Sequence, residues 1–331
     1  MVVTFILYFL SAAALVYFSM KCADYVDLLD KKTNMSGAFI GGVILAAITS
    51  LPELVTSITA ITVVDNPGLI IGNVLGSNVF NLCIFGATTA LSVKAFANAK
   101  IGKSHIATII CTIVADILMI ATLLINPDYT RIPYVEINGA SLVILIIYFI
   151  SLKFLANDDS ENDEEDNSNL TLKQIVIRFV IMAIGLVGMS FLVTHFTDKI
   201  AEEYQLGASL AGAIFLGVVT SLPELASSVV LVRKRNFNAM VGNVVGSNMF
   251  NFTIFSISDF IAGNKYVYID SAASRYMIYF GIISTVFVAA SILMQNRFKK
   301  TNPTKGAKLV TYVVLGAAVL VSYLACMVLS R

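Results

Sequence analysis

The chain has 331 residues, of which 57% are hydrophobic and 13% are charged. Ordinary soluble domains are about 45–50% apolar and about 25% charged, so the composition excludes a water-soluble globule. A formal net charge of +1 gives no indication of a nucleic-acid partner. The four cysteines, Cys22, Cys83, Cys111 and Cys326, have no paired short spacing, which argues against a disulfide framework and a zinc site.

Apolar stretches of membrane-spanning length recur along the whole chain. A transmembrane helix needs about 20 apolar residues, and the pattern predicts an all-α integral membrane protein of ten helices. Their approximate ranges are 2–20, 36–64, 67–93, 104–126, 135–156, 172–196, 207–232, 238–262, 272–295 and 307–329. The first stretch has no basic segment before it, so we interpret it as a retained span rather than a cleaved signal.

An acidic run separates the fifth stretch from the sixth. Seven of the nine residues from Asp158 to Asp166 are acidic, which predicts a solvated cytoplasmic linker over residues 157–171. A regulatory calcium site is the alternative interpretation, but the run lacks the glycine that an EF-hand loop needs at its sixth position.

The basic residues are distributed unequally between alternate loops. Of the 22 lysines and arginines, 17 fall on one set of loops and 5 on the other when the stretches are counted from an external N-terminus. The positive-inside rule then places both termini outside. Since five helices return the chain to the opposite side, two similar halves of five must be inverted relative to each other.

The two halves are in fact similar in sequence. Residues 43–57 read VILAAITSLPELVTS and residues 214–228 read IFLGVVTSLPELASS, with 8 of 15 positions identical. GNVLGSNVFN at 72–81 and GNVVGSNMFN at 242–251 agree at 8 of 10 positions. Their offsets, 171 and 170, preserve the spacing. We therefore predict two inverted five-helix repeats, 1–156 and 172–331.

The first repeated block places a carboxylate near the middle of a span. Glu53 and Glu224 carry charges that cost about 2.5–3.5 kcal/mol to insert, so a polar or ionic partner is required. Each follows a proline, which cannot donate to the carbonyl four residues earlier. The oxygens freed in this way belong to Ile48 and Val219, and the hydroxyls within a turn are Thr49, Ser50, Thr220 and Ser221.

The second block adds amide and hydroxyl groups at a spacing of four residues. These stripes comprise Asn73, Ser77 and Asn81 in the first half and Asn243, Ser247 and Asn251 in the second. Such oxygen donors suit calcium, which takes about 6–8 oxygens, whereas softer metals prefer nitrogen and sulfur. Two carboxylates balance one calcium or two sodium ions, and an inverted repeat would bring both to the midplane.

TSLPE followed by GNxxGSNxFN, present twice in ten spans, resembles the two repeats of the sodium/calcium exchanger family within the cation/calcium antiporter superfamily. The resemblance implies a prokaryotic-type antiporter that exchanges calcium for sodium by alternating access, with the first and sixth spans as a sliding gate and no cofactor. The ion ligands it implies are Glu53, Glu224, Thr49, Ser50, Ser77, Asn81, Thr220, Ser221, Ser247 and Asn251. The short linker suggests a prokaryotic plasma membrane.

Some positions depart from that family pattern. Ile48 and Val219 stand where relatives often have glycine, and Ser256 stands where Gly86 predicts a glycine in the second repeat. Several relatives, including potassium-dependent exchangers, carry Asp at the position of Asn251, so potassium cotransport is disfavoured here. Proton-coupled calcium exchangers usually show GNxxE, and neither block has that Glu.

Three other functions remain as alternatives. A proton-coupled cation antiporter is the nearest, because protons could replace sodium at the same carboxylates. A passive cation channel is disfavoured by duplicated broken helices. An intramembrane hydrolase would need paired carboxylates but no doubled Asn and Ser stripe. Asp116, in the fourth span without a repeat partner, is expected to have a structural or accessory role, and the oligomeric state is open.

Overall fold

The computed structural model describes residues 2–33, 35–63, 65–125, 130–132, 137–157, 168–204, 217–301 and 303–329. These residues form helices and no strand. The long helices of the first half are α1 (Val2–Lys32), α4 (Leu51–Thr62), α5 (Gly68–Leu91), α7 (Ser104–Leu124) and α9 (Gly139–Ala156). Those of the second half are α10 (Leu172–Glu203), α12 (Leu222–Arg233), α13 (Phe237–Ala262), α14 (Ala272–Thr301) and α15 (Lys305–Leu329). The all-helical prediction is confirmed for this part of the chain.

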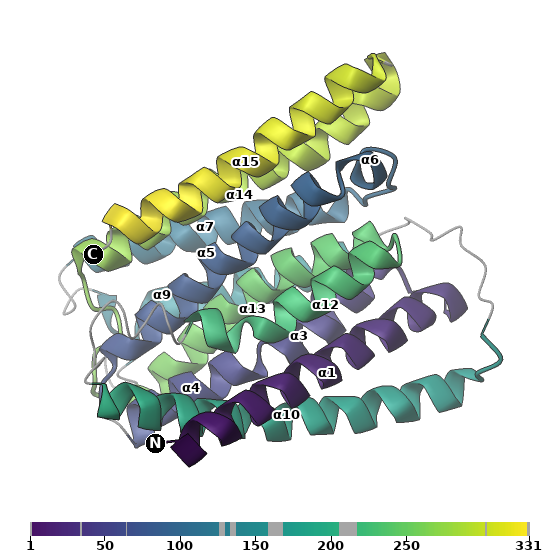
Figure 1. Ribbon diagram of the computed structural model, residues 1–331. Helices are drawn as coiled ribbons and strands as arrows, with labels where there is room; N and C mark the ends of the chain where they lie inside the picture. Colours follow the sequence, from purple (N-terminus) through teal and green to yellow (C-terminus); the bar gives the residue numbers. More distant parts are fainter. Residues whose placement is uncertain are drawn as a thin grey trace.

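The helices lie roughly side by side in one bundle (Figure 1). At one edge α1 packs against α10, and at the opposite edge α14 packs against α15. Between them α5 packs against α13, and each contacts both α4 and α12. The helices that carry the repeated motifs therefore form the centre of the molecule.

Eight helical segments among the described residues are long and apolar enough to cross a membrane. They match eight of the ten predicted spans, so the chain is an integral membrane protein. Of the two others, α13 has 26 residues, which at about 1.5 Å per residue is ample length, but its asparagines lower its hydropathy. Residues 205–216, where the other predicted span of 207–232 begins, lie outside the described residues. So does most of the predicted linker, residues 158–167.

The second predicted span, 36–64, is a helix in several pieces. It comprises α2 (Gly37–Phe39), the π-helix η1 (Ile40–Leu45), α3 (Ala46–Thr49) and α4. The π-helical turn lies where Gly41 and Gly42 approach the backbone of α13: a Cβ atom on Gly242 would lie 2.8 Å from the amide nitrogen of Gly42. Only glycine permits this backbone contact, which brings the first broken helix directly onto the second half.

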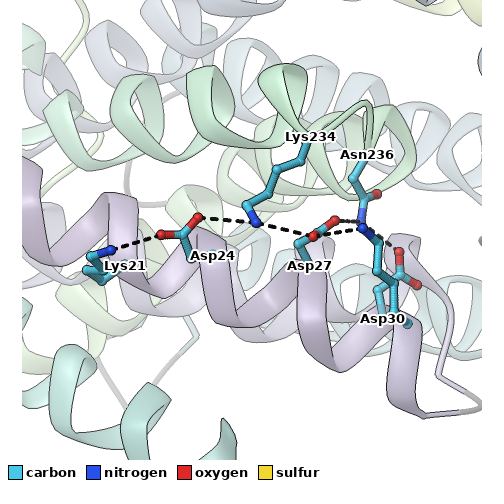
Figure 2. Close-up of polar contacts among 7 residues, drawn as sticks. Lys21, Asp24, Asp27, Asp30, Lys234 and Asn236 are labelled. Carbon is cyan, nitrogen blue, oxygen red and sulfur yellow. Dashed lines mark hydrogen bonds and ion pairs between the residues drawn. The ribbon is translucent and has the colours of Figure 1, made fainter. Parts of the chain in front are cut away.

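Helix α1 continues well beyond the predicted end of its span at residue 20. Its last turns carry Asp27 and Asp30, which are 1% and 6% exposed. The side-chain amide of Asn236, at the start of α13, donates to both carboxylates at 3.2 and 2.7 Å, and Lys234 lies 3.5 Å from Asp27 (Figure 2). Asn236 also accepts the amide of Ala239 at 3.0 Å, so one side chain caps α13 and attaches α1 to it.

Candidate functional site

Two helices break at equivalent serines, and each break starts a new helix with a buried carboxylate in its first turn. Ser50 has φ −88° and ψ 10°, and Ser221 has φ −88° and ψ 11°. Pro52 and Pro223, two residues after these serines, lie in the first turn of the new helix, where the missing N–H of a proline costs nothing. Glu53 and Glu224 are both 0% exposed. The break predicted from the Pro-Glu pair is therefore present in both halves.

The serine at each break bonds the carboxylate of the other half. Ser50 Oγ donates to Glu224 Oε1 at 2.9 Å, and Ser221 Oγ donates to Glu53 Oε1 at 3.0 Å. The first bond joins residues that are 174 positions apart in the sequence, and the second joins residues that are 168 positions apart. They bring the two carboxylates into one polar cluster, and hydrogen bonds to charged acceptors are about twice as strong as neutral ones.

The central helices α5 and α13 add one hydroxyl each to this cluster. Ser77 Oγ donates to Glu53 Oε1 at 3.2 Å and lies 3.4 Å from Thr220 Oγ1. Ser247 Oγ donates to Glu224 Oε1 at 3.5 Å. Thr49 Oγ1 donates to Asn243 Oδ1 at 3.4 Å. The hydroxyl residues predicted from the repeated blocks therefore meet, with each half contributing the same groups.

Two asparagines donate hydrogen bonds to the helices that carry the two glutamates. Asn73 Nδ2 donates to the backbone oxygen of Glu53 at 3.1 Å and to Ser57 Oγ at 3.1 Å. Asn243 Nδ2 donates to Ser227 Oγ at 3.0 Å. These amide nitrogens hold the carboxylate-bearing turns in place, and a donor nitrogen directed into the protein cannot serve as a cation ligand.

Several buried oxygens have no hydrogen-bond partner in the described part of the chain. They include the second carboxylate oxygen of each Glu and one amide oxygen on each of four asparagines, namely Glu53 Oε2, Glu224 Oε2, Asn73 Oδ1, Asn81 Oδ1, Asn248 Oδ1 and Asn251 Oδ1. The amide oxygen of Asn78 is not among them, because it accepts a bond from Asn251 at 2.9 Å. Buried polar atoms are normally satisfied. A concentration of bare oxygens beside two uncompensated carboxylates favours a cation-binding site.

The predicted residues differ in how they enter this site. Asn81 is 0% exposed and both polar atoms of its side chain lack a partner among the described residues. Asn251 uses its nitrogen to reach Asn78 on α5 and leaves its oxygen without a partner. Ile48, which is half-buried, and Val219, which is buried, lie in the turn before each break. The residues four positions later, Pro52 and Pro223, have no N–H to donate to the carbonyls of Ile48 and Val219.

Asn78 and Asn248, which the sequence analysis did not single out, connect α5 to α13. Asn248 Nδ2 donates to the backbone oxygen of Asn78 at 3.2 Å, and Asn251 donates to the Asn78 side chain. Ser57 and Ser227, which accept hydrogen bonds from Asn73 and Asn243, were also not singled out from the sequence. The signal for Asn78 and Asn248 was present, because the GSN triplet is identical in both blocks.

Asp116 does not join the cluster. It lies on α7, is 4% exposed, and makes no hydrogen bond or ion pair within the described part of the chain. An intramembrane carboxylate without a partner is unfavourable when ionised. Nothing in its contacts connects it to the two glutamates.

Comparison with known proteins agrees with this geometry. The model of the family described as sodium/calcium exchanger protein matches residues 2–156 and 174–331. The chain belongs to the sodium/calcium exchanger family. An uncharacterized membrane protein of Methanocaldococcus jannaschii, MJ0091, is 30% identical over 73% of this chain and 76% of its own length. CaxA of Alkalimonas amylolytica, named as a candidate antiporter, is 27% identical over 83% of this chain and 85% of its own length.

A solved structure shares the fold of this exchanger. The sodium-calcium exchanger NCX_Mj, soaked with sodium and calcium, superimposes with a TM-score of 0.70 over 100% of this chain and 99% of its own, at 21% identity. The family places this exchanger among membrane ion antiporters and not among enzymes, as the sequence predicted.

Proposed function

We propose that this protein exchanges calcium for sodium across the membrane at a site built around Glu53 and Glu224. The remaining ligands are the hydroxyls of Thr49, Ser50, Ser77, Thr220, Ser221 and Ser247, the amide oxygens of Asn81 and Asn251, and the carbonyls of Ile48 and Val219. Two glutamates balance one calcium or two sodium ions, so either ion neutralises the same buried charge.

The reciprocal serine–glutamate bonds carry this proposal. They unite carboxylates from distant parts of the chain, and no basic side chain of the described residues pairs with either one. Two buried negative charges without a cationic side chain need a bound cation or protons. The surrounding donors are all oxygens, which suits calcium and sodium rather than a soft metal.

We further propose the ten-helix, inverted-repeat arrangement, with repeats 1–156 and 172–331 joined by a cytoplasmic linker. The matching backbone angles at Ser50 and Ser221 support it. So do Asp65 and Arg235, 170 residues apart, which both adopt a left-handed conformation with φ of 56° and 62°. Helix α1 begins and α15 ends at the same end of the bundle (Figure 1), as both termini outside a prokaryotic plasma membrane require.

Helices α1 and α10 are suited to be the moving gate. They pack on each other at one edge of the bundle (Figure 1) and contribute no side chain to the carboxylate cluster. Helix α1 packs on α12, where Ser19 Oγ donates to the carbonyl of Pro223 at 2.5 Å, and α10 packs on α4, where Thr194 Oγ1 lies 3.4 Å from Thr56 Oγ1. Sliding these helices would open the cluster to one side without dismantling it.

Ion flux in sealed vesicles tests the proposal. Calcium uptake that requires an outward sodium gradient, and is not driven by a proton gradient of equal size, is the expected result. Uptake driven by protons alone would replace this function with the proton-coupled antiporter. Uptake without any counter-ion would indicate a channel, and absence of ion flux from folded protein would contradict transport altogether.

A further inference from the structure

Two adjoining hollows at one end of the bundle are lined by basic side chains. The first, about 570 Å³, lies between the turn from α5 to α6 (Val93–Phe96) and the end of α12, and its charged residues are Lys94, Arg233 and Arg235. The second, about 350 Å³, lies between the residues after α6 and the start of α15, and its charged residues are Lys94, Lys305 and Lys308. Lys94 lines both, so the two hollows form one basic region.

These five cations have no partner in the described part of the chain. None of them forms an ion pair or a side-chain hydrogen bond there, and no acidic residue lines either hollow. Lys234, which lies between Arg233 and Arg235 in sequence, does pair with Asp24 and Asp27. The charge of the hollows is therefore available to an external anion.

The position of the hollows identifies what kind of anion can reach them. They lie where α5 and α12 end and α15 begins, the depth at which phospholipid head groups meet the ends of membrane helices. Apolar side chains continue from both: Leu91 on the rim of the first is 88% exposed, and Val310 one turn into α15 is 63% exposed. An anion that carries its own apolar chains fits this boundary, since basic pockets between membrane helices bind anionic head groups.

We propose that the two hollows around Lys94 bind the phosphate-bearing head group of an anionic phospholipid. Arginine and lysine supply charge-assisted bonds to the phosphate oxygens, and the acyl chains lie along the apolar surface beside Leu91 and Val310. The bound lipid joins the ends of α5, α12 and α15. Because α5 carries Ser77 and α12 carries Glu224, it stabilises the helices of the carboxylate cluster relative to each other.

Lipid binding can be measured directly, without reference to transport. The purified protein in neutral detergent is titrated with dioleoyl phosphatidylglycerol or dioleoyl phosphatidylcholine, and bound lipid is counted by native mass spectrometry. The variants are Arg233→Gln with Arg235→Gln, and Lys305→Gln with Lys308→Gln. Each cation near an anionic head group contributes about fivefold in affinity, so each pair should weaken phosphatidylglycerol binding about 25-fold, whereas phosphatidylcholine should bind weakly throughout.

Lys173→Gln is the matched control. Lys173 is exposed and lies in the first turn of α10. Helix α10 begins at the same end of the bundle as α15 but lies at the opposite edge (Figure 1). The Lys173→Gln variant should leave binding unchanged, and Lys305→Arg with Lys308→Arg should retain it. Equal loss in Lys173→Gln, equal binding of phosphatidylcholine, or displacement of the lipid by an equal concentration of inorganic phosphate would each overturn the proposal.

Discussion

Replacing Glu53 by Gln separates the charge of the carboxylate from its shape. In the folded protein Glu53 Oε1 accepts from Ser77 at 3.2 Å and from Ser221 at 3.0 Å, and the amide oxygen of Gln can accept the same two bonds. The variant also no longer inserts a charge that costs about 2.5–3.5 kcal/mol. We therefore expect Glu53→Gln to fold with little or no loss of stability.

Calcium binding should respond very differently. A carboxylate about 2.4 Å from calcium attracts it by on the order of 10 kcal/mol at an effective dielectric constant of 20, before lost hydration is set against it. If even about 3 kcal/mol of this survives, binding weakens about 100-fold. We expect at least that decrease in sodium-dependent calcium uptake by Glu53→Gln vesicles, and the same for Glu224→Gln.

The assay compares initial rates of calcium uptake in vesicles at equal protein content, with an outward sodium gradient. Thermal unfolding and a monodisperse size-exclusion profile check the fold of each variant. Glu203→Gln, at an exposed position on the last turn of α10, controls for the loss of one negative charge. Normal calcium flux through either folded glutamate variant would refute the reasoning, because the site would then not depend on that charge.

Three further substitutions test other parts of the structure. Ser221→Ala should lower apparent calcium affinity up to about tenfold through loss of its bond to Glu53, and this effect should be smaller in a Glu53→Gln background, where the acceptor of the bond is neutral; fully additive losses would contradict the contact. Asn251→Asp adds a charge beside a bare amide oxygen, so the sodium or pH dependence of uptake should change, and an identical profile would show that position 251 is no ligand. Asn236→Leu removes donors to two buried carboxylates at a cost of about 1.5–3 kcal/mol each; its unfolding temperature should fall by several degrees, and that of the exposed Asn98→Leu should not.

The broken helices could be predicted because the cause lies within a few residues. A proline in a helix interior removes one hydrogen bond and forces a break, and a carboxylate beside it in an apolar span needs a polar environment. The candidate site residues Glu53 and Glu224 follow from these two local facts. The repetition of the motif at nearly constant spacing strengthens the inference without any structural information.

The pairing of side chains could not be predicted in the same way. Ser50 stands three residues before Glu53, and sequence spacing alone favours a contact within that turn. Its hydroxyl instead reaches Glu224, because α12 and α13 pack against the first half. The same limit applies to Asn236, whose bonds to Asp27 and Asp30 join residues 209 and 206 positions apart, and to the full length of α1, whose charged end is stabilised by this contact.

The reciprocal bonds restrict how the site can open. Glu53 depends on a hydroxyl from the start of α12, and Glu224 depends on one from the start of α4. If one broken helix moved away from the other, both bonds would be lost together and two buried carboxylates would lose a donor each. By contrast, the bonds of α1 to the second half do not involve either glutamate: Ser19 donates to the Pro223 carbonyl, and Asp24 and Asp27 pair with Lys234 at the end of α12. Displacing the edge helices would therefore leave both serine–glutamate bonds intact, which is why we propose that the change of access involves α1 and α10.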